Sequence, residues 1–311
     1  MTDDVTDFFK KYELLRSTAD LIATKPKDRV CRYCQLNRPE VRFRQTPHLV
    51  PELLGRNEHL AYDECDSCNG LFSRYEKDLS TFLLAYRAMV GIRGKRGFPQ
   101  FHSRQIPGIG HSRLEAGHDP GTGLQITVRT PSDFVVNHEE RTGKVKFRVP
   151  QFIPLHVYKA LLKIGLGLLP PKHIEAHRNS FDWLMGKQVE LPLSPLVLIT
   201  PIYRRYFKVP SAHLFRAKEL VVADTEYPEC TLVVEAANVV IQIFLPFTAD
   251  LISVHQQHRT LALAAYPGFA RDELVPGSCW ELKLHDLSVN NPVTYDVVRD
   301  FAFDSIDREE Y

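Results

Sequence analysis

Four cysteines stand in two Cys-x-x-Cys pairs, Cys31-Arg-Tyr-Cys34 and Cys65-Asp-Ser-Cys68. Four thiolates suit tetrahedral Zn(II), because soft sulfur ligands complete its coordination shell without strain. A zinc ion held by four cysteines has no open position for water, so the expected role of this zinc is structural. Any catalytic chemistry must therefore come from other residues.

A histidine between the two pairs is the candidate for that chemistry. His48 follows a β-prone segment, residues 41–44, and precedes Pro51, Glu52 and Gly55. An imidazole can take a proton near neutral pH, which is what a general base must do. A lone histidine is usually an ordinary surface or core residue. Here the order Cys-x-x-Cys, His-x-x-Pro, Gly, Cys-x-x-Cys-Asn and then a helix favours a functional role.

This order resembles the HNH endonucleases of the His-Me finger, or ββα-metal, superfamily, and in particular the subgroup that carries a four-cysteine zinc. The combined order is far more specific than either cysteine pair alone. The resemblance covers residues 28–90, and its motifs are Cys31-x-x-Cys34, His48-Leu-Val-Pro51-Glu52, Leu54-Gly55, Cys65-x-x-Cys68-Asn69 and Phe72-x-x-Tyr75-Glu76.

The resemblance implies a ββα-metal domain in which a hairpin and a helix hold one divalent metal, Mg(II) or Mn(II), against the scissile phosphate. His48 would take a proton from the attacking water, and the metal would neutralise phosphate charge. Asn69 occupies the last motif position and would be a catalytic residue that contacts this metal. Glu76, two helical turns later on the same face, would be a ligand of the metal or a contact behind its ligands.

Two features depart from the family pattern. Pro47 stands where many members have an acidic metal ligand. The usual spacing of the middle motif asparagine falls near Leu60, and the alternatives are Asn57, His59 and Asp63. The full shell of the catalytic metal and the residue that orients His48 are therefore left open.

Asn69 and Glu76 also have simple structural explanations. An asparagine at the start of a helix suits an N-cap or a turn. A glutamate within a helix often pairs with a nearby base, here Arg74 or Lys77. The sequence leaves these alternatives open.

The amino-acid composition is typical of an ordinary soluble globular protein. The chain has 311 residues, of which 44% are hydrophobic and 25% charged, and its net charge is +1. This length favours two domains and permits a sizeable core in each. Because the charge is balanced, nucleic-acid affinity must come from local basic patches. No apolar run could cross a bilayer and no signal peptide opens the chain, so we expect a cytoplasmic protein without a membrane partner.

Residues 91–123 are rich in glycine and proline, which break regular structure, and are expected to form a linker. No acidic residue occurs between Leu79 and Arg113. Basic residues in such a segment can neutralise phosphates without reading a sequence. The candidates for nucleic-acid binding are Arg93, Lys95, Arg96 and Arg104.

The fold class predicted for the whole chain is α+β. A helix is expected over about residues 5–23, another from near Cys68, and a hairpin turn at residues 139–143. Cys230 and Cys279 lie in strand-like apolar runs and are interpreted as buried core thiols. The parts are an N-terminal helical segment (1–27), the nuclease domain (28–90), the basic linker (91–123) and a C-terminal α+β domain (124–311) with an antiparallel sheet and two or more helices.

These features predict a metal-dependent HNH endonuclease that hydrolyses phosphodiester bonds in DNA. A small nuclease joined to a larger domain resembles bacterial antiphage effectors, in which the second domain senses a signal or assembles the enzyme. The C-terminal domain would then bind an activating ligand or a protein partner, with room for a homo-oligomer. The alternative is a non-catalytic zinc module that binds nucleic acid or protein. The choice between DNA and RNA is left open.

Overall fold

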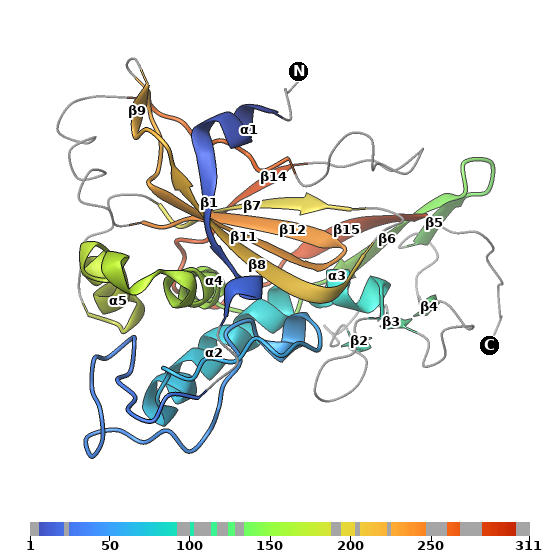
Figure 1. The fold of residues 1–311 in the computed structure, drawn as a ribbon. Helices are drawn as coiled ribbons and strands as arrows, with labels where there is room; N and C mark the ends of the chain where they lie inside the picture. Colours follow the sequence, from blue (N-terminus) through green and yellow to red (C-terminus); the bar gives the residue numbers. More distant parts are fainter. Residues whose placement is uncertain are drawn as a thin grey trace.

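The computed structural model describes residues 6–21, 25–91, 100–102, 113–116, 124–127, 134–187, 194–202, 206–222, 225–246, 260–267 and 282–302. The chain is mixed α+β with antiparallel sheets and a few helices, which confirms the predicted class (Figure 1). In the described part, no helix combines the length and apolar character of a membrane span. The α-helices are α1 (Thr6–Lys11), α2 (Asp66–Phe82), α3 (Leu84–Met89), α4 (Pro154–Leu168) and α5 (Arg178–Leu184), with 3₁₀ turns at Thr18–Asp20, Glu52–Leu54, Pro171–His173 and Glu175–His177.

The largest sheet is antiparallel throughout and has a buried centre. Its strand order is β1 (Tyr12–Ser17), β8 (Phe207–Ala217), β11 (Cys230–Ala237), β12 (Val239–Phe244), β7 (Leu196–Pro201) and β14 (Lys283–Asp286). Along β11, Leu232 and Val234 face one hydrophobic cluster and Val233 faces another. Burial on both faces explains why β11 and β12 are nearly continuous apolar runs in the sequence.

Smaller sheets carry the rest of the described strands. The predicted hairpin turn is confirmed, because Arg141 lies at φ 50° between two antiparallel strands. The orders are β15 (Asp296–Ala302), β6 (Thr142–Arg148), β5 (Phe134–Asn137); β2 (Gln100–His102), β3 (Arg113–Ala116), β4 (Leu124–Thr127); and β13 (Thr260–Leu261), β10 (Thr225–Glu226), β9 (Val221–Val222).

Helix α4 is the central element of the fold. Most of its residues are apolar and buried, as expected of a helix enclosed by other elements. It packs against β8, β11 and β12 on one side and against α2 on the other (Figure 1). Near its end, a Cβ at Gly167 would overlap Leu49 Cδ1 and lie 3.0 Å from Tyr33 Oη. The missing side chain lets the segment that follows His48 pack directly on α4.

One hydrophobic cluster runs from the cysteine region into the large sheet. It includes Phe72 and Leu79 of α2, Leu161 of α4 and Ile241 of β12, and the cysteines Cys31, Cys65 and Cys68 also belong to it. A second cluster, built around stacked Phe8 and Tyr12, covers the opposite face of the sheet. The cysteine region and the sheet are therefore joined by shared buried side chains.

Two expectations about regular structure are wrong in part. The helix predicted over residues 5–23 ends at Lys11, and β1 follows it and pairs with β8. An open sheet edge offers this segment backbone partners that a local helical pattern cannot reveal. The glycine- and proline-rich linker contains β2 and β3, because both short stretches lack glycine and proline and can pair.

Candidate functional site

The four cysteines of the two predicted pairs lie together in the structure. Their sulfur atoms are all within 4.8 Å of one another, with Sγ–Sγ distances of 3.7 Å for Cys31–Cys68 and 3.9 Å for Cys34–Cys65. Sulfurs that share a tetrahedral zinc ion are separated by about 3.8 Å, given Zn–S bonds of about 2.3 Å. All four are free thiols. The cluster can therefore hold a zinc ion.

The electrostatics of the cluster favour a cation. Contact with Cys68 lowers the pKa of the Cys31 thiol to about 5, and the same contact raises the pKa of Cys68. Burial raises the pKa of Cys34 to about 11. One thiolate forms easily, while further thiolates are opposed by burial and by the charge already present. A divalent cation would remove that opposition.

Local backbone structure sets the cysteines in place. In the first pair, the Gln35 N–H donates to the Cys31 carbonyl at 2.8 Å, and Gln35 adopts a left-handed φ of 61°. In the second pair, the Cys65 sulfur caps α2 by accepting from the Cys68 N–H at 3.5 Å. The second pair therefore lies at the N-terminal end of α2, where the helix dipole stabilises negative charge.

The first turn of α2 is tied to the segment that precedes His48. The Asp66 carboxylate accepts from the backbone N–H groups of Arg44 and Gln45, each at 3.0 Å. Gln45 in turn meets Asn69, whose Nδ2 donates to Gln45 Oε1 at 2.7 Å. Asn69 lies inside α2 and the N-cap is Cys65, so the N-cap explanation for Asn69 does not apply. The Gln45 contact fixes which way the Asn69 amide faces.

His48 lies in a short antiparallel pairing. Residues 47–49 run beside residues 59–61, with a β-bridge between His48 and Leu60. The preceding β-prone residues 41–44 do not form a strand. Two backbone hydrogen bonds flank the bridge, from Leu49 N–H to His59 O (2.6 Å) and from Ala61 N–H to Pro47 O (2.8 Å).

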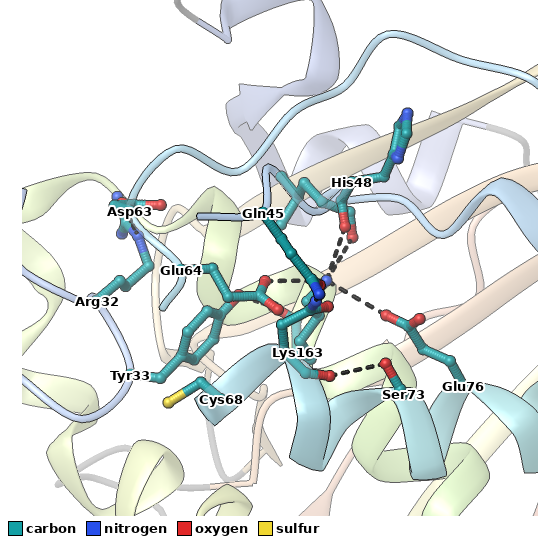
Figure 2. Close-up of polar contacts among 12 residues, drawn as sticks. Arg32, Tyr33, Gln45, His48, Asp63, Glu64, Cys68, Ser73, Glu76 and Lys163 are labelled. Atoms are coloured by element: carbon teal, nitrogen blue, oxygen red, sulfur yellow. Dashed lines mark hydrogen bonds and ion pairs between the residues drawn. The ribbon is translucent and has the colours of Figure 1, made fainter. Parts of the chain in front are cut away.

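The side chain and the backbone of His48 face different partners. His48 Nδ1 lies 3.8 Å from Glu52 Oε2, and the side chain is 24% exposed. Figure 2 shows the imidazole directed away from Lys163 and Glu76, while the backbone carbonyl faces Lys163. The structure therefore does not bring the predicted base and Glu76 side chain to side chain.

Lys163 of α4 is a buried cation that no motif in the sequence predicts. Its Nζ donates to the carbonyl oxygens of His48 at 2.8 Å and Leu49 at 3.4 Å. The same atom lies 3.2 Å from Glu64 Oε2 and 3.4 Å from Glu76 Oε1 (Figure 2). Helix α4 therefore holds the backbone of His48 through this lysine. The available signal was a lysine near the apolar end of a helix, where the neighbouring residues are hydrophobic and a buried lysine needs partners.

Lys163 and the two carboxylates beside it stabilise one another's charged forms. Burial raises the pKa of Glu64 to about 7, although the Lys163 ammonium opposes this shift. Burial also acts to lower the pKa of Lys163, but the carboxylates of Glu64 and Glu76 outweigh it and the net shift is upward. Lys163 therefore stays charged. Glu76 pairs with Lys163, which fits the supporting role predicted for it. Its predicted role as a metal ligand stays a prediction.

The alternatives for the middle motif position, Asn57, His59 and Asp63, each form a hydrogen bond with a different part of the chain. Asn57 bridges two backbone carbonyls of the loop that follows His48, so it shapes that loop. The choice among the three stays open. The hydrogen bonds are Asn57 Nδ2 to Val50 O (3.1 Å) and Gly55 O (2.9 Å), His59 Nε2 with Pro210 O (3.1 Å), and Arg32 Nε to Asp63 Oδ2 (2.7 Å).

Within the described residues, no group of three His, Cys, Asp or Glu ligand atoms gathers around His48 or Glu76. In that part of the chain, three or more His, Cys, Asp or Glu ligand atoms lie within 4.8 Å of one another in two places, the four cysteines and a second cluster that includes His177. Neither place includes His48 or Glu76. The basic candidates Arg93, Lys95, Arg96 and Arg104 lie outside the described residues.

We expect Lys163→Met to destabilise the protein by roughly 3–5 kcal/mol, because the buried Glu64 carboxylate loses its cation. The measurement is urea unfolding followed by circular dichroism, with zinc content checked in each sample. Lys159→Met is the matched control, since Lys159 lies one turn earlier on α4 and its Nζ donates to the Trp183 carbonyl at 3.1 Å. Its cost should be clearly smaller.

The double variant Lys163→Met/Glu64→Gln separates charge from packing. Removing the stranded carboxylate should recover part of the stability lost in Lys163→Met. A double variant that is as unstable as the sum of the two single variants would show that the lysine acts through its backbone contacts to His48 and Leu49 alone.

Comparison of the chain with protein-family models, curated proteins and solved structures finds no match. The grounds for a function therefore lie in the motif order of the sequence and in the geometry of residues 31–82.

Proposed function

We propose that this chain is a metal-dependent endonuclease of the HNH type that hydrolyses phosphodiester bonds in DNA. One observation carries the proposal. The pairing of residues 47–49 with 59–61 leads directly into a helix whose start is capped by Cys65 and whose first turn carries Asn69. The motif order implies two short paired segments followed by a helix, and this local geometry supports the proposal.

In this proposal His48 is the general base. The Glu52 carboxylate lies 3.8 Å from Nδ1, beyond hydrogen-bond distance. Were the two to close to a hydrogen bond, Nδ1 would carry the proton and Nε2 would be left to accept one from water. The side chain is partly exposed, so a phosphodiester can reach it. Lys163 holds the His48 carbonyl, so it fixes the backbone from which the imidazole extends.

Asn69 is the proposed contact to the divalent metal. Because its Nδ2 is engaged by Gln45, its Oδ1 is the atom suited to a hard cation. A bound Mg(II) or Mn(II) would neutralise charge on the phosphate and on the leaving oxygen. Such ions commonly take only one or two protein ligands and complete their shell with water and substrate phosphate, so few protein donors are needed.

Regulation by the C-terminal region is part of the proposal. The contact of α4 with both the large sheet and His48 supports it, because a shift of α4 would move the backbone of the base. A defence effector against phage, silent until this region binds a signal, would use such a link. The basic residues of 91–123 support nucleic acid as the substrate.

A second candidate is the non-catalytic zinc module. The direction of the His48 imidazole, away from Glu76, favours it. In that case the four-cysteine zinc would present a binding surface, and His48 and Asn69 would serve structure alone.

The two candidates differ in plasmid degradation. Purified full-length chain, with zinc content measured and Mg(II) and Mn(II) removed by dialysis, should nick or linearise plasmid only when either ion is returned. The parallel assay is growth arrest after induction in cells, which also reports activity that needs a cellular signal. Binding of plasmid without cleavage, together with normal growth on induction, would favour the zinc module.

A further inference from the structure

A second cluster of metal-ligating side chains lies outside the proposed nuclease site. His177, Glu229 and Cys230 each offer one ligand atom, and these atoms lie within 4.8 Å of one another. Cys230 Sγ and His177 Nε2 are 3.8 Å apart. His177 and Cys230 are 0% and 1% exposed, and Glu229 is 9% exposed. The histidine and the cysteine are therefore buried, and the Glu229 side chain, 11% exposed, lies at the margin of the buried region.

Regular structure fixes the three positions. Cys230 is the first residue of β11, and its carbonyl accepts from the Leu245 N–H at 2.9 Å. The Glu229 carbonyl accepts from the Ala217 N–H of β8 at 2.8 Å. His177 is the N-cap residue of α5. The ligands therefore come from the sheet and from the start of a helix, which is what a preorganised site requires.

The donor set suits zinc. Imidazole nitrogen, thiolate sulfur and carboxylate oxygen are the three donor types that zinc takes from proteins. Nitrogen and sulfur atoms that share a tetrahedral zinc are about 3.6 Å apart. The observed 3.8 Å between Cys230 Sγ and His177 Nε2 is close to this separation. No large movement would be needed to admit the ion.

The neighbouring polar groups distinguish this cluster from an ordinary thiol–imidazole contact in a hydrophobic core. A carboxylate shares the site, and one of its oxygens, Glu229 Oε1, lies 3.2 Å from Arg216 Nε. His173 stands four residues before His177, and within the described chain its buried Nε2 has no hydrogen-bond partner.

We propose that His177, Glu229 and Cys230 form a second zinc site, independent of the four cysteines. With three protein ligands, its fourth position is available to water or to a further donor such as His173. The site joins the start of α5 to the N-terminal end of β11.

The proposal places α5 between two metal centres. His177 begins this helix, and Met185, directly after it, has its sulfur 4.0 Å from Cys68 Sγ. A helix of seven residues is roughly 10 Å long. One short helix would then connect the second zinc site with the zinc cluster at the start of α2.

The test is zinc content of full-length, folded protein by elemental analysis. Cys230→Ser and His177→Gln should each lose one zinc ion relative to wild type, while the four-cysteine site keeps its own. His138→Gln, which changes an exposed histidine in the turn between β5 and β6, is the control and should keep the wild-type content. Circular dichroism confirms the fold of each variant.

A second measurement does not depend on variants. Wild-type protein reconstituted with Co(II) should bind two ions per chain, and their visible spectra should differ because one site has four thiolates and the other has one. Wild type that binds one ion, and Cys230→Ser that keeps this ion, would overturn the second site. This result would leave the proposed nuclease activity untouched, since neither readout measures cleavage.

Discussion

His48→Ala should lower DNA cleavage by about two to four orders of magnitude, the range expected for losing a positioned proton acceptor. Zinc content, folding and DNA binding should stay unchanged, because the contact of Lys163 is to the backbone carbonyl of residue 48, which alanine keeps. The measurement is the rate of plasmid cleavage at saturating Mg(II), with growth arrest on induction as the cellular counterpart.

Asn69→Ala distinguishes the base from the metal contact. Its cleavage should also fall, but raising Mg(II) or Mn(II) should restore part of the rate, whereas His48→Ala should gain nothing from added metal. Gln45→Ala is the matched control, because it removes the hydrogen bond to Asn69 and leaves Oδ1 in place. It should have a smaller effect than Asn69→Ala.

The His48→Ala prediction has a matched control and an outcome that would contradict it. His138→Ala controls for the loss of an imidazole elsewhere and should cleave as wild type does. If His48→Ala also cleaves at the wild-type rate under conditions in which wild type is active, the HNH assignment is wrong and the zinc module takes its place.

Cys65→Ser should abolish folding of the region around α2. The free energy of binding a structural zinc is also folding free energy, with apparent values of about 10–16 kcal/mol in small zinc domains. Serine is a good N-cap, so this substitution keeps the capping group of α2 while removing one metal ligand. The result therefore reports on the zinc and not on the cap.

Zinc content and circular dichroism measure this effect together. Ser67→Ala is the matched control, since Ser67 is an exposed residue within the same Cys-x-x-Cys pair and should change neither quantity. Well-folded Cys65→Ser protein, or folded wild type with less than about half a zinc ion at these four thiols, would contradict a closed structural site.

The part of the site that the sequence predicts is the local part. The two cysteine pairs and the start of the helix near Cys68 follow from short spacings, and the four sulfurs do lie together. Lys163 could not be placed in the same way, because its partners Glu64 and Glu76 are far from it along the chain. Only its position in an apolar helix hinted at burial.

The same limit explains the errors in the fold. The strand β1 depends on β8, which lies about two hundred residues later in the sequence, so no local pattern could reveal their pairing. His177 and Cys230 are also distant in sequence. The predicted burial of Cys230 is confirmed, and Cys279 lies outside the described residues. What the sequence could not supply was the set of contacts between distant segments.

The hydrogen bond from Lys163 to the His48 carbonyl also sets an order of events during synthesis. A ribosome adds roughly 5–20 residues per second, so the segment with His48 emerges several seconds before α4. During that interval Glu64 has no lysine beside it, and Leu49 has no helix to pack on. The motif therefore reaches its final geometry only after the central helix has been made. If the proposed activity is correct, an unfinished chain is a poor nuclease, which protects the DNA of the cell that makes it.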